Sequence, residues 1–222
     1  MANIGLFGGT FDPIHLGHLK TVLEVKERFH LETVFLIPAS QPPHKTDRAI
    51  APPADRMAML KIAVRHLPGL AVSETEINRS GLSYSVETVA EFRQRFAGTA
   101  DLFFILGLDA FVEIHTWKAY QRLFERVAFI VMTRPGSGSR QSPPAEETLQ
   151  AFLDARISDG YVFESETGSF RHPVLQPVRL SATTPVNISS TGIRENILHR
   201  QPFEHLLPEG VAAYISTKGL YR

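Results

Sequence analysis

Two histidines that follow a pair of glycines could bind phosphate near the start of the chain. They occur in Gly8-Gly9-Thr10-Phe11-Asp12-Pro13-Ile14-His15-Leu16-Gly17-His18, after a short apolar run at residues 4–7 that predicts a buried strand. Apolar residues then recur at helical spacing, so His15 and His18 share one face of the first helical turn. A glycine turn that leads into a helix N-terminus presents backbone N–H groups and favours phosphate. The stretch therefore predicts a site that binds and polarises phosphate.

A second group of anion-binding residues occurs near the other end, in Ile188-Ser189-Ser190-Thr191-Gly192-Ile193-Arg194. Hydroxyl and N–H groups at a helix N-terminus can surround an anion, and Arg194, one turn later, can add charged donors. Taken alone, this stretch is better explained as a helix N-cap with a surface arginine.

Strand-like and helix-like segments alternate, which predicts an α/β fold with a mainly parallel sheet. The segment 102–106 is the clearest strand, since its five residues are all apolar. Gly107 and Asp109 follow it, at the end of a strand where ligands bind in open α/β sheets. Ser83 and Glu87 predict a capped helix start. Further strands are expected at 34–37, 70–72, 127–132 and 178–180, and further helices at 55–67, 145–155, 188–199 and from Pro208.

Composition limits the class of protein. The 222 residues suit a single domain, 1–222, and we interpret 137–173 as a surface elaboration with a mobile beginning. Lys plus Arg and Asp plus Glu number 23 each, so the formal net charge is zero. The charge balance therefore gives no indication that the protein binds nucleic acid or an anionic membrane. With no cysteine there is no disulfide, thiolate metal site or thiol nucleophile. The N-terminus lacks a basic region followed by a long apolar run, and no later apolar stretch reaches membrane-spanning length, so we expect a cytoplasmic protein.

The first stretch resembles the N-terminal motif of the nucleotidylyltransferase superfamily, in the form found in bacterial nicotinate-nucleotide adenylyltransferases. The second, Ile-Ser-Ser-Thr-x-Ile-Arg, resembles the second phosphate-binding motif of the same family. Two motifs in the expected order make incidental histidines and a simple N-cap poor explanations. The resemblance implies a Rossmann-like nucleotidylyltransferase fold, a mainly parallel sheet with helices on both faces. It also implies transfer of the adenylyl group of ATP to nicotinate mononucleotide by direct in-line attack, giving deamido-NAD and pyrophosphate for NAD biosynthesis.

The resemblance also assigns roles to individual residues. Trp117 taken alone would be a core residue, but the family places a nicotinate-stacking tryptophan there. Mg²⁺ would come with ATP, and no metal site made by the protein is expected. The residues implied in catalysis are His15, His18, Lys45 and Arg194. Those implied in ATP binding are Gly8, Gly9, Thr10, Phe11, His15, His18, Gly107, Asp109, Arg134, Ile188, Ser189, Ser190, Thr191 and Arg194. Those implied in acceptor binding are Thr10, Lys45, Ser83, Tyr84, Ser85, Asp109 and Trp117.

Other classes fit the sequence less well. The glycine patterns of dinucleotide dehydrogenases and P-loop enzymes are absent, and a zinc hydrolase would need a third ligand at recognisable spacing. Pantetheine-phosphate adenylyltransferases are shorter, lack Pro-Pro-His-Lys and have Thr where His15 stands. A nucleotide-sensing module without turnover would not need the intact motifs. This chain departs from the family at Ser85, Glu87 and Leu108. Its sequence leaves open a homo-oligomer and the preference for nicotinate over nicotinamide mononucleotide.

Overall fold

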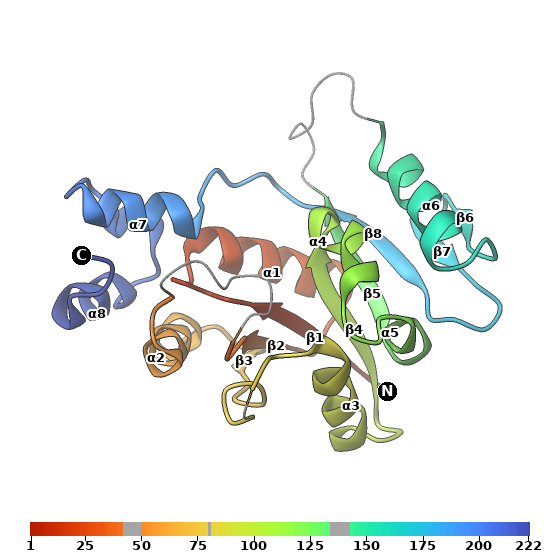
Figure 1. Cartoon of the computed structure of the whole chain (residues 1–222), viewed down its shortest axis with the longest axis horizontal. Helices are drawn as coiled ribbons and strands as arrows, with labels where there is room; N and C mark the ends of the chain where they lie inside the picture. Colours follow the sequence, from red (N-terminus) through yellow and green to blue (C-terminus); the bar gives the residue numbers. More distant parts are fainter. Residues whose placement is uncertain (42–49, 80, 134–142) are drawn as a thin grey trace. The chain divides into compact units, whose positions relative to one another are not determined.

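The computed structural model describes residues 1–41, 50–79, 81–133 and 143–222, and it divides the chain into two compact units (Figure 1). The first unit comprises residues 1–7, 30–32 and 84–185, and the second comprises 8–29, 33–83 and 186–222. Each unit combines segments that are far apart in the sequence. A single domain over 1–222 stays a prediction.

The first unit contains a sheet whose strands lie in the order β1-β4-β5-β8-β7-β6. The pairs β1–β4, β4–β5 and β5–β8 are parallel, whereas β7 is antiparallel to both β8 and β6. A mainly parallel sheet confirms the predicted fold class. The strands are β1 (Ala2–Gly9, of which residues 2–7 belong to this unit), β4 (Ala100–Gly107), β5 (Ala128–Thr133), β6 (Val162–Glu164), β7 (Ser169–Arg171) and β8 (Val178–Ala182).

Aromatic rings fill the core of this unit. Phe111, Phe124 and Phe129 are fully buried, and the ring centroid of Phe129 lies 5.4 Å from that of Phe111 and 4.7 Å from that of Phe124. Such offset and edge contacts stabilise aromatic pairs beyond the area that they bury. The helices of the unit are α3 (Ser85–Arg95), α4 (Leu108–Val112), the 3₁₀ turn Ile114–Thr116, α5 (Gln121–Arg126) and α6 (Ala145–Arg156).

The described part of the segment that we interpreted as a surface elaboration, residues 143–173, contributes to this core, and the beginning that we expected to be mobile lies outside the described residues. α6 lies beside the β6–β7 hairpin (Figure 1), and the side-chain amide of Gln150 donates to the carbonyl of Tyr161 at 2.9 Å. Tyr161 and Phe170 are buried, as are Leu149 and Leu153 on one face of α6. α6 was predicted at nearly the observed position, but the hairpin was not predicted.

The second unit contains the parallel strand pair β2 (Thr33–Pro38) and β3 (Leu70–Val72). Its helices are α1 (Leu16–Arg28), α2 (Pro53–Val64), α7 (Ser190–Leu198), the 3₁₀ turn Glu204–Leu206 and α8 (Val211–Lys218). α7 confirms the predicted helix after the serines. α8 begins three residues later than predicted from Pro208, because Gly210 at its N-cap has a φ of 82° and turns the chain before the helix.

The predicted capping of the helix near Ser83 is wrong. α3 has Tyr84 at its N-cap, without a capping side-chain hydrogen bond. The hydroxyl of Ser83 instead accepts a hydrogen bond from the backbone N–H of Ser40 at 2.9 Å. A serine hydroxyl can accept from the N–H groups of a helix N-terminus or from another backbone N–H, and here it accepts from Ser40.

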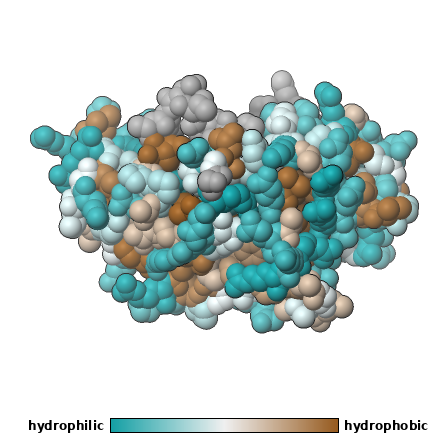
Figure 2. All heavy atoms as spheres, turned by 60° about the horizontal axis from the view of Figure 1, so that its bottom comes forward, coloured by the Kyte–Doolittle hydropathy of each residue, from teal (hydrophilic) through white to brown (hydrophobic). Residues whose placement is uncertain are grey.

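Apolar side chains lie in small separate groups among hydrophilic ones on the face drawn in Figure 2. Among the helices of the described residues, none is long and apolar enough to cross a membrane.

Candidate active site

The glycine motif begins where β1 ends, and side chains lie close to two of its glycines. A Cβ added to Gly9 would lie 3.0 Å from Cζ of Phe11, and one added to Gly17 would lie 2.9 Å from Nδ1 of His15. Phe11 itself has a φ of 50°, in the left-handed region that a phenylalanine rarely adopts. Such backbone outliers cost on the order of 1 kcal/mol and cluster at functional sites.

His15 and His18 form a reciprocal cap at the start of α1. The backbone N–H of His18 donates to Nδ1 of His15, and the backbone N–H of His15 donates to Nδ1 of His18, both at 3.3 Å. The two rings stack with centroids 3.6 Å apart. Since both Nδ1 atoms accept hydrogen bonds, this geometry assigns the proton of each neutral ring to Nε2. Each of the two side chains thus caps the helix through Nδ1 and leaves its Nε2–H as a donor on the other side of the ring.

Asp12 is buried, and donors from three distant segments satisfy it. Its Oδ1 accepts from the backbone N–H of Ala51 at 3.1 Å and from the hydroxyl of Tyr221 at 2.8 Å. The guanidinium of Arg194 donates to the backbone carbonyl of Asp12 at 2.5 Å and lies 3.6 Å from its carboxylate. Burial, together with the charge of Asp12, raises the pKa of Tyr221, so this tyrosine stays a donor. Asp12 therefore holds in place the loop between β1 and α1.

Arg56 links the loop between β1 and α1 to two neighbouring segments. It is 1% exposed, and its guanidinium donates to four backbone carbonyls, those of Ala51, Thr10, Ala39 and Ser40, at 3.0, 2.9, 2.7 and 3.1 Å respectively. A planar group with several donors suits such a cluster of acceptors. Arg56 thus supports the structure of the loop.

The N-terminus of α7 contacts the glycine motif. The hydroxyl of Ser189 accepts from the N–H of Gly192 and caps the helix, while the hydroxyl of Ser190 donates to the carbonyl of Pro13 at 3.0 Å. Arg194 also donates to the hydroxyl of Thr191 at 3.1 Å. The two motifs line one cavity of about 140 Å³, formed by Thr10, Phe11, Asp12, His18, Ile50, Ser190, Thr191 and Arg194.

The other residues implied by the resemblance have different surroundings. Gly8 and Gly9 end β1, and His15 lies buried beside His18. Ile188 and Ser189 precede α7 and do not line the cavity. Lys45 and Arg134 lie outside the described residues. Among the residues that the structure describes, no group of three or more His, Asp or Glu side chains is arranged to hold a metal ion.

Of the residues expected to bind the acceptor, Tyr84, Ser85 and Asp109 lie at helix starts, and Thr10 lines the cavity of the two motifs. Trp117 is half-buried, with its ring edge-on to Phe104 at a centroid distance of 6.2 Å, so it is not a fully buried core residue. Tyr84 and Ser85 begin α3, and Nζ of Lys118 lies 4.1 Å from the ring centroid of Tyr84. Gly107 caps α4, and Asp109 is exposed in its first turn.

Sequence reasoning missed Tyr221 and Ile50. The side chain of Tyr221 reaches Asp12 across 209 residues of sequence. Neither residue belongs to a motif, so no local signal in the sequence indicates either position.

The comparisons with known proteins agree with the fold. The family model described as cytidylyltransferase-like matches residues 6–196, and this places the chain among the nucleotidyltransferases. A relative from Desulfatibacillum aliphaticivorans is 42% identical, over 98% of this chain and 99% of its own length. One from Syntrophotalea carbinolica is 37% identical, over 99% and 97%. Both carry the name "probable nicotinate-nucleotide adenylyltransferase". The chain belongs to the nicotinate-nucleotide adenylyltransferase family.

Solved structures show the same fold at much lower sequence identity. The nicotinic acid mononucleotide adenylyltransferase of Plasmodium falciparum, complexed with NaAD, is 15% identical with a TM-score of 0.70. The coverage is 100% of this chain and 98% of that one. The same enzyme complexed with APC gives a TM-score of 0.68 at 14% identity. The predicted Rossmann-like nucleotidylyltransferase fold is thus confirmed.

Proposed function

We propose that this protein transfers the adenylyl group of ATP to nicotinate mononucleotide and releases deamido-NAD and pyrophosphate. The observation that carries this proposal is the cavity lined by both motifs, in which Thr10 and His18 meet Ser190 and Arg194. Family membership supports it, because the relatives are named for this reaction. The P. falciparum neighbour was solved with NaAD and with APC, which supports nucleotide ligands.

In the proposed reaction, a phosphate oxygen of nicotinate mononucleotide attacks the α-phosphorus of ATP in line. The bond from that phosphorus to the bridging oxygen breaks, and pyrophosphate leaves with the electron pair. No covalent enzyme intermediate forms, so the protein needs only to position the two substrates and stabilise charge. The Nε2–H groups of His15 and His18, together with the guanidinium of Arg194 and the ammonium of Lys45, would supply donors to the phosphates.

Nucleotide binding would also use the start of α7 and the glycine turn. Gly8, Gly9 and Phe11 would let the backbone approach ATP, and Ile188 with Ser189, Ser190 and Thr191 would present N–H and hydroxyl groups. We propose that Gly107, Asp109 and Arg134 contribute to this binding, with the Asp109 carboxylate accepting hydrogen bonds from sugar hydroxyls.

Mg²⁺ would enter with ATP and neutralise charge on the pyrophosphate that leaves. The carboxylate that lines the cavity of the two motifs does not suit a resident ion, because Asp12 already accepts from Ala51 and Tyr221 and lies beside Arg194. We therefore propose that substrate phosphates and water provide most of its ligands.

The acceptor would be recognised by an aromatic face and by amide donors. We propose that Trp117 stacks on the nicotinate ring and that the start of α3, at Tyr84 and Ser85, donates to its carboxylate. We also propose a role in acceptor binding for Ser83, Thr10 and Lys45. Backbone N–H groups bind a charged carboxylate more strongly than a neutral carboxamide. They therefore favour nicotinate mononucleotide over nicotinamide mononucleotide.

The test is a comparison of acceptors with the purified protein, ATP and Mg²⁺. We expect kcat/KM to be highest with nicotinate mononucleotide, with deamido-NAD and pyrophosphate formed in equal amounts. A higher kcat/KM with 4′-phosphopantetheine would instead favour a pantetheine-phosphate adenylyltransferase. Tight ATP binding without turnover of any acceptor would favour a sensing module, and either result would refute the proposal.

A further inference from the structure

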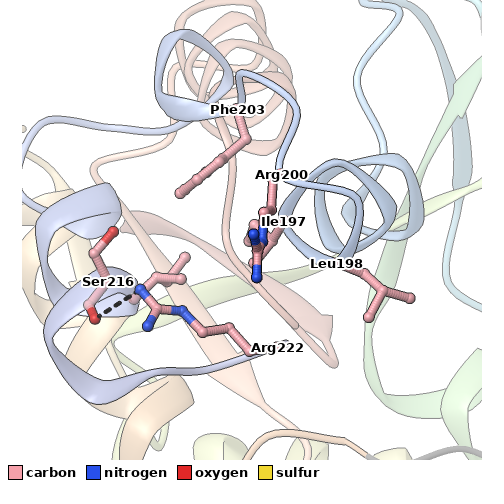
Figure 3. Close-up of a pocket in the computed structure, with 7 residues that line it drawn as sticks. Ile197, Leu198, Arg200, Phe203, Ser216 and Arg222 are labelled. Carbon is pink, nitrogen blue, oxygen red and sulfur yellow. Dashed lines mark hydrogen bonds between the residues drawn. The ribbon is translucent and has the colours of Figure 1, made fainter.

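A second cavity, of about 510 Å³, lies between the C-terminal end of α7 and α8, and it shares no lining residue with the cavity of the two motifs. Its volume lies within the range of small-molecule sites. The side chains of Ile197, Phe203 and Ile215 give it apolar walls, Leu198 lies at its margin, and Arg200, Ser216 and Arg222 supply polar groups. Figure 3 shows Arg200 and Phe203, from the connection after α7, and Arg222, after α8, around this cavity.

The turn that carries Arg200 is held by hydrogen bonds. Arg200 has a φ of 55°, so the chain reverses directly after α7, and its N–H donates to the carbonyl of Ile197 at 3.1 Å. The N–H of Gln201 donates to the carbonyl of Asn196 at 2.7 Å, and the Asn196 side chain donates to the carbonyl of Pro202 at 3.2 Å. The backbone on both sides of Arg200 is therefore fixed.

The segment that carries Arg222 is fixed from the opposite side. Gly219 is the C-cap of α8, and its φ of 63° lets the N–H of Leu220 donate to the carbonyl of Ile215 at 3.1 Å. The next residue, Tyr221, is anchored by its 2.8 Å hydrogen bond to Asp12. The guanidinium of Arg222 lies 3.4 Å from the carbonyl of Ser216 (Figure 3). Hydrogen bonds thus hold the backbone that leads to each arginine, and both guanidinium groups reach the cavity on exposed side chains.

The lining combines positive charge with apolar surface. Two guanidinium groups face the cavity, and none of the residues that line it is acidic. The neighbouring Glu204 already accepts a hydrogen bond from the N–H of Phe203 at 3.1 Å. Guanidinium groups bind phosphate and carboxylate through paired donors, and an aromatic ring adds a stacking surface.

We propose that this cavity binds a small organic anion, a phosphate or carboxylate group attached to a flat apolar body. The anion would lie between Arg200 and Arg222, and the apolar body would contact Phe203, Ile197 and Ile215. The proposal does not depend on the reaction at the other cavity, since the two cavities have separate linings.

The test is a titration with phenyl phosphate, followed by NMR of protein labelled at its isoleucine methyl groups. Ile197 and Ile215 report on this cavity, whereas Ile50 reports on the cavity of the two motifs. We expect saturable shifts at Ile197 and Ile215 with a Kd on the order of 1 mM, as for other ligands of this size. Inorganic phosphate and benzyl alcohol, which each lack one half of the probe, should bind at least about tenfold more weakly.

Variants then test whether Arg200 and Arg222 bind the anionic group of the probe. Arg200→Gln and Arg222→Gln should each weaken phenyl phosphate binding about tenfold, while Arg65→Gln, at an exposed arginine after α2, should leave it unchanged. Both pocket arginines are exposed, so we expect these variants to keep the methyl spectrum of the folded protein. Phe203→Leu is the further variant and should weaken phenyl phosphate more than inorganic phosphate. Shifts confined to Ile50, shifts that do not saturate, or equal binding by the glutamine variants would each overturn the proposal.

Discussion

Replacing Arg56 by methionine should destabilise the protein strongly, although this residue touches no substrate in the proposed reaction. Arg56 is 1% exposed and donates to the carbonyls of Thr10, Ala39, Ser40 and Ala51. Methionine keeps most of the apolar volume but donates to none of them. A buried polar group left without a partner costs about 1–3 kcal/mol.

The expected loss is about 4 kcal/mol, if water reaches two of the four carbonyls and the other two stay without donors. For a chain of this length, that loss corresponds to a decrease in Tm of about 8–16 °C. Arg56→Lys should cost about half as much, because one ammonium cannot reach four acceptors that surround a planar group. Urea unfolding followed by circular dichroism measures both changes, provided that the m value is constant.

The matched control is Arg65→Met, at the C-cap of the same helix, where the side chain is exposed. Its unfolding free energy should change by no more than about 0.5 kcal/mol. A loss below about 1 kcal/mol in Arg56→Met, or Arg56→Lys as stable as the parent, would refute the argument that these four hydrogen bonds hold the loop.

Further measurements address the candidate site and its surroundings. His18→Ala should lower kcat roughly a hundredfold at saturating ATP, because one fixed donor is lost, and near-normal turnover in a folded variant would contradict its role. Trp117→Ala should raise KM for nicotinate mononucleotide roughly tenfold with little change for ATP, and Trp117→Phe should restore part of it. Tyr221→Phe should lower the unfolding free energy by about 1–3 kcal/mol, since buried Asp12 loses a donor; an unchanged value would contradict that bond. Burial raises the pKa values of Tyr161 and Tyr221 above the ordinary 10.0, so the folded state retains protons that the unfolded state loses. Stability should therefore fall as the pH rises above about 10, by up to about 1.4 kcal/mol per pH unit for each tyrosine, and less steeply in Tyr221→Phe.

Much of the framework could be predicted from the sequence, because long elements carry strong periodic signals. The five apolar residues of 102–106 identified β4, and the alternation of segments indicated the mainly parallel sheet. The β6–β7 hairpin could not be predicted in this way, since its two strands are three residues long and show no period. They are stabilised by the pairing of β7 with β8 and by the burial of Phe170, which are tertiary effects.

In the candidate site, too, local patterns could be predicted from the sequence and tertiary contacts could not. The two motifs identified most of the residues that line the cavity, because their spacing is local. The capping exchange between His15 and His18 follows from side-chain geometry that spacing alone does not give. Tyr221 could not be found, because its contact with Asp12 is made by the tertiary fold.

The bond between Asp12 and Tyr221 also has a consequence for the order of events on the ribosome. Asp12 is translated early, but the hydroxyl that it needs belongs to a residue 209 positions later. Until then, the Asp12 carboxylate lacks one of the donors that satisfy it in the folded protein. The loop between β1 and α1 should therefore complete its hydrogen bonds late, and a protease that clips the chain between Lys218 and Tyr221 would remove one donor to Asp12.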